Sequence, residues 1–176
     1  AKHFNGEIVS ADSMQIYSGM QIATAKPTKA EMDGVPHHMM GFLPPDKTYS
    51  VASYVNDASK CIADIHSRGM LPFIVGGTGL YVDSLLNNIS FSDDKRDEEY
   101  CLRLRGGRNI KRIIRAIEFY KTTGKTITEQ IKESHNIPSP YSAVKLGLNC
   151  RDRQVLYDRI NRRVDIMLDE GLLEEA

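Results

Sequence analysis

The alternation of apolar and polar stretches predicts strands and helices in turn along the chain. A β-branched run over residues 7–10 predicts a short strand, and the largely apolar run 71–75 predicts a second, buried strand. Between them, apolar residues recur at helical spacing over 51–68, with Ser50 as the cap and Gly69 as the stop. A strand, a long helix and a second strand in this order indicate an α/β fold with a parallel, doubly wound sheet.

Further elements carry similar boundary signals. Helices are predicted over 80–86, directly after a glycine turn, and over 109–121, and a third strand is predicted over 143–148. The last predicted helix, 153–170, has Asp152 as its cap. Its predicted core face consists of Leu156, Ile160, Val164 and Met167.

Three shorter features complete the predicted elements. Thr28 with Glu31, and Thr126 with Glu129, have the spacing of capping boxes, and each pair predicts the start of a short helix. The first residues of the chain read as the tail of a helix that is capped by Gly6.

Composition is that of an ordinary soluble globular protein. The 176 residues are 41% hydrophobic and 26% charged, enough for one domain with a sizeable core, and the formal net charge is zero. Positive charge is nevertheless concentrated, because residues 103–125 hold eight Lys or Arg against one acid. Three distant cysteines without a CxxC spacing indicate a reducing cytoplasm, and no apolar run reaches the length of a membrane span.

The segment after the first strand carries the strongest candidate for chemistry. Asp12 follows that strand closely, with Ser13 and Gln15 beside it. Ligands of open α/β sheets bind at the carboxyl ends of the strands, so Asp12 is placed to take a proton from an amine or a hydroxyl. The same carboxylate could instead cap a turn, which is a common role for Asp.

A glycine turn follows the second strand and adds a second candidate. Residues 76–79 read Gly-Gly-Thr-Gly and lead into a helix, so their backbone N–H groups and the Thr78 hydroxyl could bind a phosphate. A tight strand-to-helix turn needs glycine for its dihedral angles alone, so this pattern also has a purely structural explanation.

Basic side chains on the predicted helix 109–121 form the third candidate. Lys111, Arg112 and Arg115 lie away from its isoleucine stripe, where they could contact an RNA backbone or could simply face solvent. Arg153, at the start of the last helix, is the better placed residue for a two-pronged phosphate contact.

Two other motifs do not support a site. The run 120–126 ends in Gly-Lys-Thr like a Walker A loop, but Phe119 stands where the first glycine is needed and a helix precedes it instead of a strand. His37 and His38 are adjacent and lack a third ligand at a usual metal spacing, which favours a packing role in a loop.

Several segments together resemble the tRNA dimethylallyltransferase family, which are isopentenyltransferases acting on tRNA adenosine. They cover most of the chain, and their order and relative placement agree with the family pattern. The matching pieces are VSADSMQIY (9–17), ATAKPT (23–28), VPHH (35–38), YSVASYV (49–55), VGGTGLY (75–81), IKRIIRAIEFYKTTGK (110–125) and LYDRINRRVDIMLDEGLLEE (156–175).

The resemblance implies a P-loop-kinase-like parallel sheet flanked by helices. It further implies transfer of a dimethylallyl group from dimethylallyl diphosphate to N6 of the adenosine that is 3′-adjacent to the anticodon in tRNA. Asp12 matches the general base, Thr78 a catalytic residue of the reaction channel, and Arg153 a ligand of the substrate diphosphate, with Mg²⁺ as the cofactor. We expect a cytoplasmic monomer without membrane contact. The residues that match tRNA contacts are Asp12, Ser13, Met14, Gln15, Lys111, Arg112, Ile113, Ile114 and Arg115.

The chain departs from the family pattern in two places. The family's phosphate loop, which also supplies a magnesium ligand, is expected just before Ala1, and only residues 101–108 stand where the family has a helical insertion that grips tRNA. We therefore expect 1–92 to be the catalytic α/β core, 93–108 a remnant of the insertion, and 109–176 the remainder of the core with the start of a C-terminal helical region. On this expectation the chain by itself is inactive and holds no metal.

Other functions stay open at this level. An adenylate isopentenyltransferase shares the chemistry but acts on free AMP, ADP or ATP, and a non-catalytic RNA-binding remnant is consistent with the missing phosphate loop. A small-molecule P-loop kinase is disfavoured because nothing resembles its lid. The basic helix and the place for a tRNA-gripping insertion favour tRNA.

Overall fold

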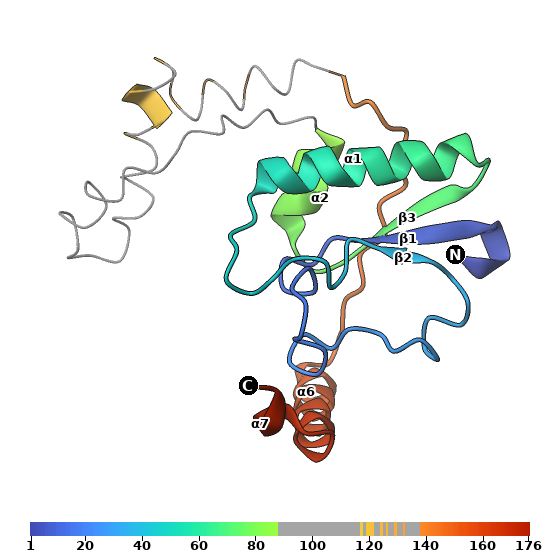
Figure 1. The fold of residues 1–176 in the computed structure, drawn as a ribbon, viewed down its shortest axis with the longest axis vertical. Helices are drawn as coiled ribbons and strands as arrows, with labels where there is room; N and C mark the ends of the chain where they lie inside the picture. The colour runs from blue at the N-terminus through green and yellow to red at the C-terminus, as the bar shows by residue number, and fades with distance from the viewer. Residues whose placement is uncertain are drawn as a thin grey trace. The chain divides into compact units, whose positions relative to one another are not determined.

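The computed structural model describes residues 1–87 and 138–176, with residues 117, 119–121, 124, 126, 129 and 132 between them (Figure 1). The chain divides into two compact units, Ala1–Val82 with Ala143–Ala176, and Asp83–Ser142. The first unit contains the sheet. Its elements are η1 (Lys2–Phe4), β1 (Gly6–Ser10), β2 (His37–His38), α1 (Val51–Ser67), β3 (Leu71–Val75), α6 (Arg153–Asp169) and α7 (Leu172–Glu175), while α2 (Gly79–Leu86) runs from the first unit into the second.

The sheet is parallel throughout and has the strand order β2-β1-β3. In the central strand β1, Ile8 is paired with His37 of β2 and with Phe73 of β3. The pairing with β3 runs over all five residues, so both strands end at the same edge. The predicted strands 7–10 and 71–75 are thus confirmed, although β3 is half-exposed and is not the buried strand that the apolar run predicts.

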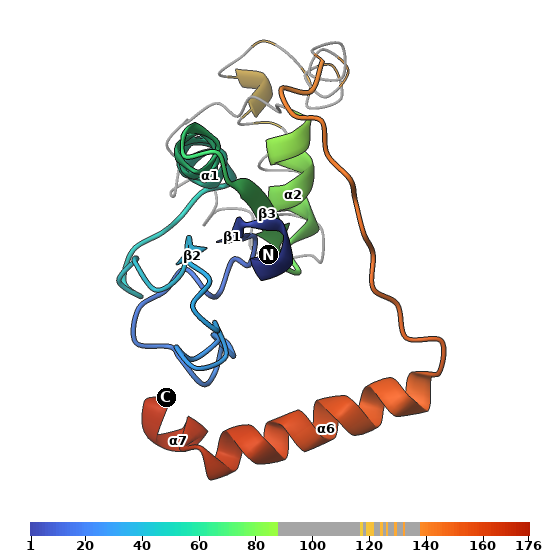
Figure 2. The same cartoon turned by 90° about the vertical axis from the view of Figure 1, so that its right-hand side faces the viewer.

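Helix α1 packs against β1 and β3 with the stripe that the periodicity predicts (Figure 2). Tyr54, Ala58, Ile62 and Ile65 are buried, and each fully buried large side chain contributes roughly 1.5–3 kcal/mol. The Ser50 hydroxyl accepts from the backbone N–H of Ser53, as expected of the predicted cap. Near the start of α2, the ring of Tyr81 stacks on Tyr54 with the centroids 4.1 Å apart.

The predicted strand 143–148 is wrong. Residues 143–148 have no regular secondary structure, and the side chains of Val144, Leu146 and Leu148 are almost fully exposed. The residue pattern is that of a strand, but a strand needs a hydrogen-bonded neighbour, and within the described residues the segment pairs with none.

Helix α6 forms as predicted, but its predicted core face does not. The Asp152 carboxylate accepts from the backbone N–H of Gln154, which confirms the cap. No residue of α6 is buried, and Leu156, Ile160 and Val164 are 40–48% exposed. The helix therefore depends on its cap and on local propensity, without burial of an apolar face.

Two predictions about short segments are wrong: the helix after Thr28, and Gly6 as the cap of the first helix. Thr28 and Glu31 make the reciprocal bonds of a capping box, yet only a turn follows, because Asp33 and Gly34 have positive φ angles (47° and 74°) that a helix does not allow. The left-handed residue after η1 is Asn5 and not Gly6, which already belongs to β1.

The second capping box, Thr126 with Glu129, forms as predicted. Most of the predicted helix 109–121 and all of 93–108 lie outside the described residues; Ile117 and residues 119–121 are helical.

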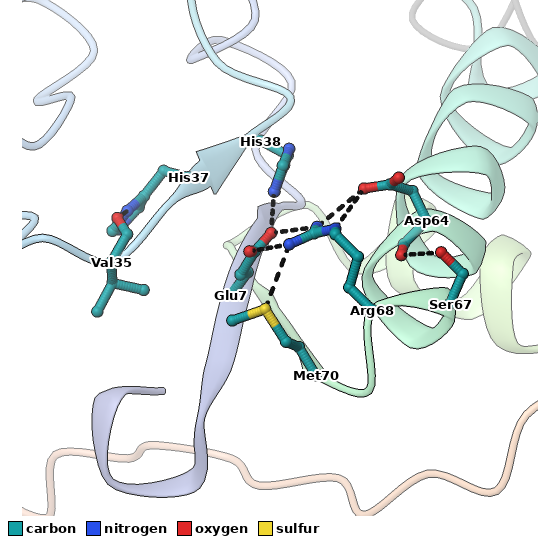
Figure 3. A network of polar contacts seen from close by, with 8 residues as sticks. All are labelled: Glu7, Val35, His37, His38, Asp64, Ser67, Arg68 and Met70. Carbon is teal, nitrogen blue, oxygen red and sulfur yellow. Dashed lines mark hydrogen bonds and ion pairs between the residues drawn. The ribbon is translucent and has the colours of Figure 1, made fainter.

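A buried ion pair links the central strand β1 to the end of α1 and to β2 (Figure 3). The Glu7 carboxylate, 4% exposed, receives two hydrogen bonds from the Arg68 guanidinium at 2.5 and 2.7 Å and lies 2.6 Å from Nε2 of His38. Arg68 also bonds Asp64 within α1. The Arg68 hydrogen bonds, more than the His38 contact, lower the pKa of Glu7 from 4.5 to about 2, although burial opposes this shift.

We expect Glu7→Gln to lower the free energy of unfolding by about 3 kcal/mol at neutral pH, as the pKa shift implies. Because the pKa of Glu7 is lower in the folded state, its stabilisation is complete above pH 4.5 and is lost as the pH falls towards 2. Urea unfolding should therefore show that the free energies of unfolding of the variant and the natural protein converge as the pH falls from 4.5 towards 2. The exposed Glu170→Gln is the control; an equal difference at all pH values would contradict the prediction.

Gly76 permits the ends of β1 and β3 to meet. A Cβ atom there would lie 2.3 Å from the carbonyl carbon and oxygen of Ala11, whereas a Cβ on Gly77 would meet nothing within 4 Å. We expect Gly76→Ala to destabilise the protein by about 3 kcal/mol, the upper part of the range for overpacked sites, and Gly77→Ala to cost far less. Urea unfolding of both variants measures this difference, and equal stabilities would refute it.

Candidate functional site

The candidate site lies where β1 and β3 end. The backbone N–H of Ala11 donates to the Val75 carbonyl at 2.7 Å, and that of Thr78 donates to the Ala11 carbonyl at 3.0 Å. The sheet pairing thus continues past the strands and brings the Asp12 segment against the glycine turn. These two regions were separate candidates in the sequence, and the fold places them together.

The Asp12 carboxylate caps the turn that follows it. Its Oδ1 accepts from the backbone N–H groups of Met14 (2.8 Å) and Gln15 (3.4 Å). Among the described residues, its second oxygen has no hydrogen-bond partner. Asp12 therefore caps the turn, as one of the two interpretations of the sequence predicts, and this role uses only Oδ1. Its second oxygen, Oδ2, stays available to accept a proton.

Thr78 is joined directly to the Asp12 turn. Its Oγ1 accepts from the backbone N–H of Ser13 at 3.0 Å and lies 3.3 Å from the Ser13 hydroxyl, to which it donates. Both side chains are half-buried. The turn that Asp12 caps is thus hydrogen-bonded to Thr78 through Ser13, and we call these three residues the Asp12–Ser13–Thr78 unit.

Gln15 is bound on all sides by the protein. Its side-chain oxygen accepts from the Ser10 hydroxyl, and its Nε2 donates to the carbonyls of Thr24 and Ala25, each at 3.3 Å. Its backbone carbonyl accepts from Gly41 at 2.9 Å. The side chain therefore fixes a neighbouring loop, while the adjacent Met14 is 48% exposed.

A small open pocket adjoins this unit. Its volume is about 180 Å³, and it has Asp12 and Gln15 as polar groups and Ile8, Pro27, Met40 and Val75 as apolar walls, with His37 and Gly76 completing the lining. Ligand pockets usually measure ~300–1,000 Å³, so it suits one ring or a short apolar group.

One further predicted site residue, Arg153, is not brought to this unit. Arg153 is exposed at the first position of α6, and no contact joins it to Asp12 or Thr78 in the part of the chain that the structure describes. Lys111, Arg112, Ile113, Ile114 and Arg115 lie outside the described residues.

The described residues contain no group of three or more His, Cys, Asp or Glu side chains that could hold a metal ion. His37 bonds the Val35 carbonyl and His38 bonds Glu7, which agrees with the packing role expected for this pair. Near Asp12, one carboxylate and two hydroxyls are too few for an all-protein site. None of the described helices is long and apolar enough to cross a membrane.

Lys26 is a part of the site region that sequence reasoning missed. It is 8% exposed, and its Nζ donates to the carbonyl of Tyr17, which closes the loop between them. Burial lowers the pKa of Lys26, and the carboxylate of Glu175 partly offsets this. Lysine is rarely buried, so only its place in the ATAKPT segment could have drawn attention to it.

Comparison with known proteins identifies relatives over the whole chain. The family model described as IPP transferase matches residues 15–109 and 94–176. The tRNA dimethylallyltransferases of Halalkalibacterium halodurans and Oceanobacillus iheyensis are each 45% identical over 202 positions. These alignments cover 100% of the chain and 64% of each relative, so the chain spans less than two thirds of their length.

Solved structures agree. A tRNA Δ2-isopentenylpyrophosphate transferase from Staphylococcus epidermidis matches with a TM-score of 0.70 at 41% identity. The match covers 99% of this chain and 65% of the Staphylococcus chain. A eukaryotic dimethylallyltransferase acting on tRNA matches with a TM-score of 0.84 at 30% identity. This match covers 99% of this chain and 49% of the eukaryotic chain. The P-loop-kinase-like sheet flanked by helices is thereby confirmed. The chain belongs to the IPP transferase family.

Proposed function

We propose that the protein containing this chain transfers a dimethylallyl group from dimethylallyl diphosphate to N6 of the adenosine 3′-adjacent to the anticodon in tRNA. The observation that carries the proposal is the Asp12–Ser13–Thr78 unit beside a small pocket at the carboxyl edge of the sheet. Relatives named tRNA dimethylallyltransferase support it.

In this proposal each oxygen of Asp12 has its own role. Oδ1 holds the turn, so the carboxylate cannot rotate freely, and Oδ2 takes the proton from the N6 amine. In the same step, a bond forms between N6 and the allylic carbon, and the bond from that carbon to the diphosphate oxygen breaks. The bonding electrons leave with the diphosphate.

The departing diphosphate requires stabilisation of its negative charge. The Thr78 hydroxyl accepts from the Ser13 N–H and donates its one proton to the Ser13 hydroxyl. In this proposal that proton turns from Ser13 to an oxygen of the diphosphate when the substrate binds. Arg153 supplies a cation in this proposal. We propose Mg²⁺ as the cofactor, which would neutralise part of the charge on the diphosphate oxygens.

We assign tRNA binding to Asp12–Gln15 and to the basic stretch Lys111–Arg115. We propose that 1–92 is the catalytic α/β core, that 93–108 is the remnant of a helical insertion, and that 109–176 is the remainder of the core with the start of a C-terminal helical region. Alignments of 202 positions against 176 residues support the shortening, because the relatives carry residues in the matched span that this chain lacks. A tRNA substrate favours a cytoplasmic protein, and we propose a monomer.

Asp12→Asn tests the base and separates it from the cap. Asn keeps an oxygen that accepts from Met14 and Gln15 but cannot take the N6 proton, so we expect turnover to fall by ~10²–10⁴, far more than tRNA affinity. Single-turnover transfer and tRNA binding, measured with the full-length protein, distinguish the two effects. Asp46→Asn, at an exposed loop carboxylate, is the control; equal losses in rate and affinity would make Asp12 a positioning residue only.

The nucleic-acid substrate is tested directly with dimethylallyl diphosphate and either tRNA or AMP. We expect product with tRNA and none with AMP. The basic stretch 111–115 is proposed to bind the phosphate backbone of an RNA, and a free nucleotide has no such backbone. Turnover of AMP alone would indicate an adenylate isopentenyltransferase. RNA binding without any transfer would indicate a non-catalytic RNA-binding protein.

A further inference from the structure

A loop between the Asp12 turn and Lys26 lies beside the candidate site and has no regular secondary structure. Its shape depends on a few internal bonds, from Lys26 Nζ to the Tyr17 carbonyl and from the Ala25 N–H to the Ile22 carbonyl at 2.8 Å. Ala25 has a positive φ of 45°, which L-residues seldom adopt without support from their surroundings.

Glu175, far away in the sequence, binds the backbone of this loop. Its Oε2 accepts a 2.5 Å hydrogen bond from the backbone N–H of Ile22, in the middle of the loop. Its Oε1 is buried and has no hydrogen-bond partner in the described structure. The Glu175 carboxylate also interacts electrostatically with the ammonium of the buried Lys26.

The loop in turn holds Gln15. The carbonyls of Thr24 and Ala25 both accept from the Gln15 side chain, and the Gln15 backbone N–H points to Oδ1 of Asp12. The bonds thus run from Glu175 through the loop to the carboxylate that is proposed as the base.

We propose that Glu175 is a positioning residue, which fixes the Asp12–Gln15 turn from the C-terminal helix α7 by anchoring the backbone of the loop at Ile22. This inference rests on the proposed function for its effect on catalysis. It links the segment after α6 to the reaction site, so that the two ends of the described chain act together.

Glu175→Ala in the full-length protein tests this. We expect kcat to fall by ~10-fold with little change in the KM for tRNA, since small misplacements of a reacting group cost up to ~10²-fold. Glu175→Gln retains an acceptor for the Ile22 N–H and should restore part of the rate. The exposed neighbour variant Glu174→Gln is the matched control.

A double-mutant cycle with Gln15→Ala shows whether Glu175 acts through Gln15. If it does, the loss from Glu175→Ala is smaller in the Gln15→Ala protein than in the natural one; additive losses overturn the proposal. Amide hydrogen exchange at Ile22 and Gln15 should be faster in Glu175→Ala than in Glu174→Gln, and unchanged exchange also overturns it. This measurement needs no turnover, so it separates failure of the positioning role from failure of the proposed function.

Discussion

The parallel pairing of β1 with β3 is the constraint on which the rest of this structure depends. Five residues of each strand lie in register, and both strands therefore end at one edge. Glycines at the two ends allow this approach: a Cβ on Gly6 would clash with Leu71 and Phe73, and one on Gly76 with Ala11. Without this close contact, the Asp12 turn and Thr78 would not share hydrogen bonds.

A carboxylate lies near each end of β1, and the two have different roles. At the amino end, the Glu7 carboxylate is buried and fully occupied by Arg68 and His38, so it ties β2 and α1 to the central strand (Figure 3). At the carboxyl end, Asp12 is half-buried and uses one oxygen for its turn. A carboxylate surrounded by donors stabilises the fold, whereas one with a spare oxygen can exchange a proton.

The sequence correctly predicted the elements that are specified by residues within one continuous stretch. Helix α1 has its apolar stripe, its Ser50 cap and its Gly69 stop in one continuous stretch, and the strands β1 and β3 are short apolar runs bounded by polar or glycine residues. The segment 143–148 has the same local pattern as a strand, but lacks a neighbour in the described structure. The stripe of α6 likewise predicts burial that no described element provides.

By itself, the sequence determined the α/β class, the helix caps and the two chemistry-bearing segments, and its motifs pointed to the family. These follow from residue types at short spacing, which act within one turn or one strand. Only the tertiary structure joined Thr78 to Ser13 in the Asp12 turn, buried Lys26 and brought Glu175 to Ile22. The hydrogen bonds of Ser13 with Thr78 and of Ile22 with Glu175 link residues 65 and 153 positions apart. No local pattern specifies them, because they depend on how the strands pair and where the loops between them return.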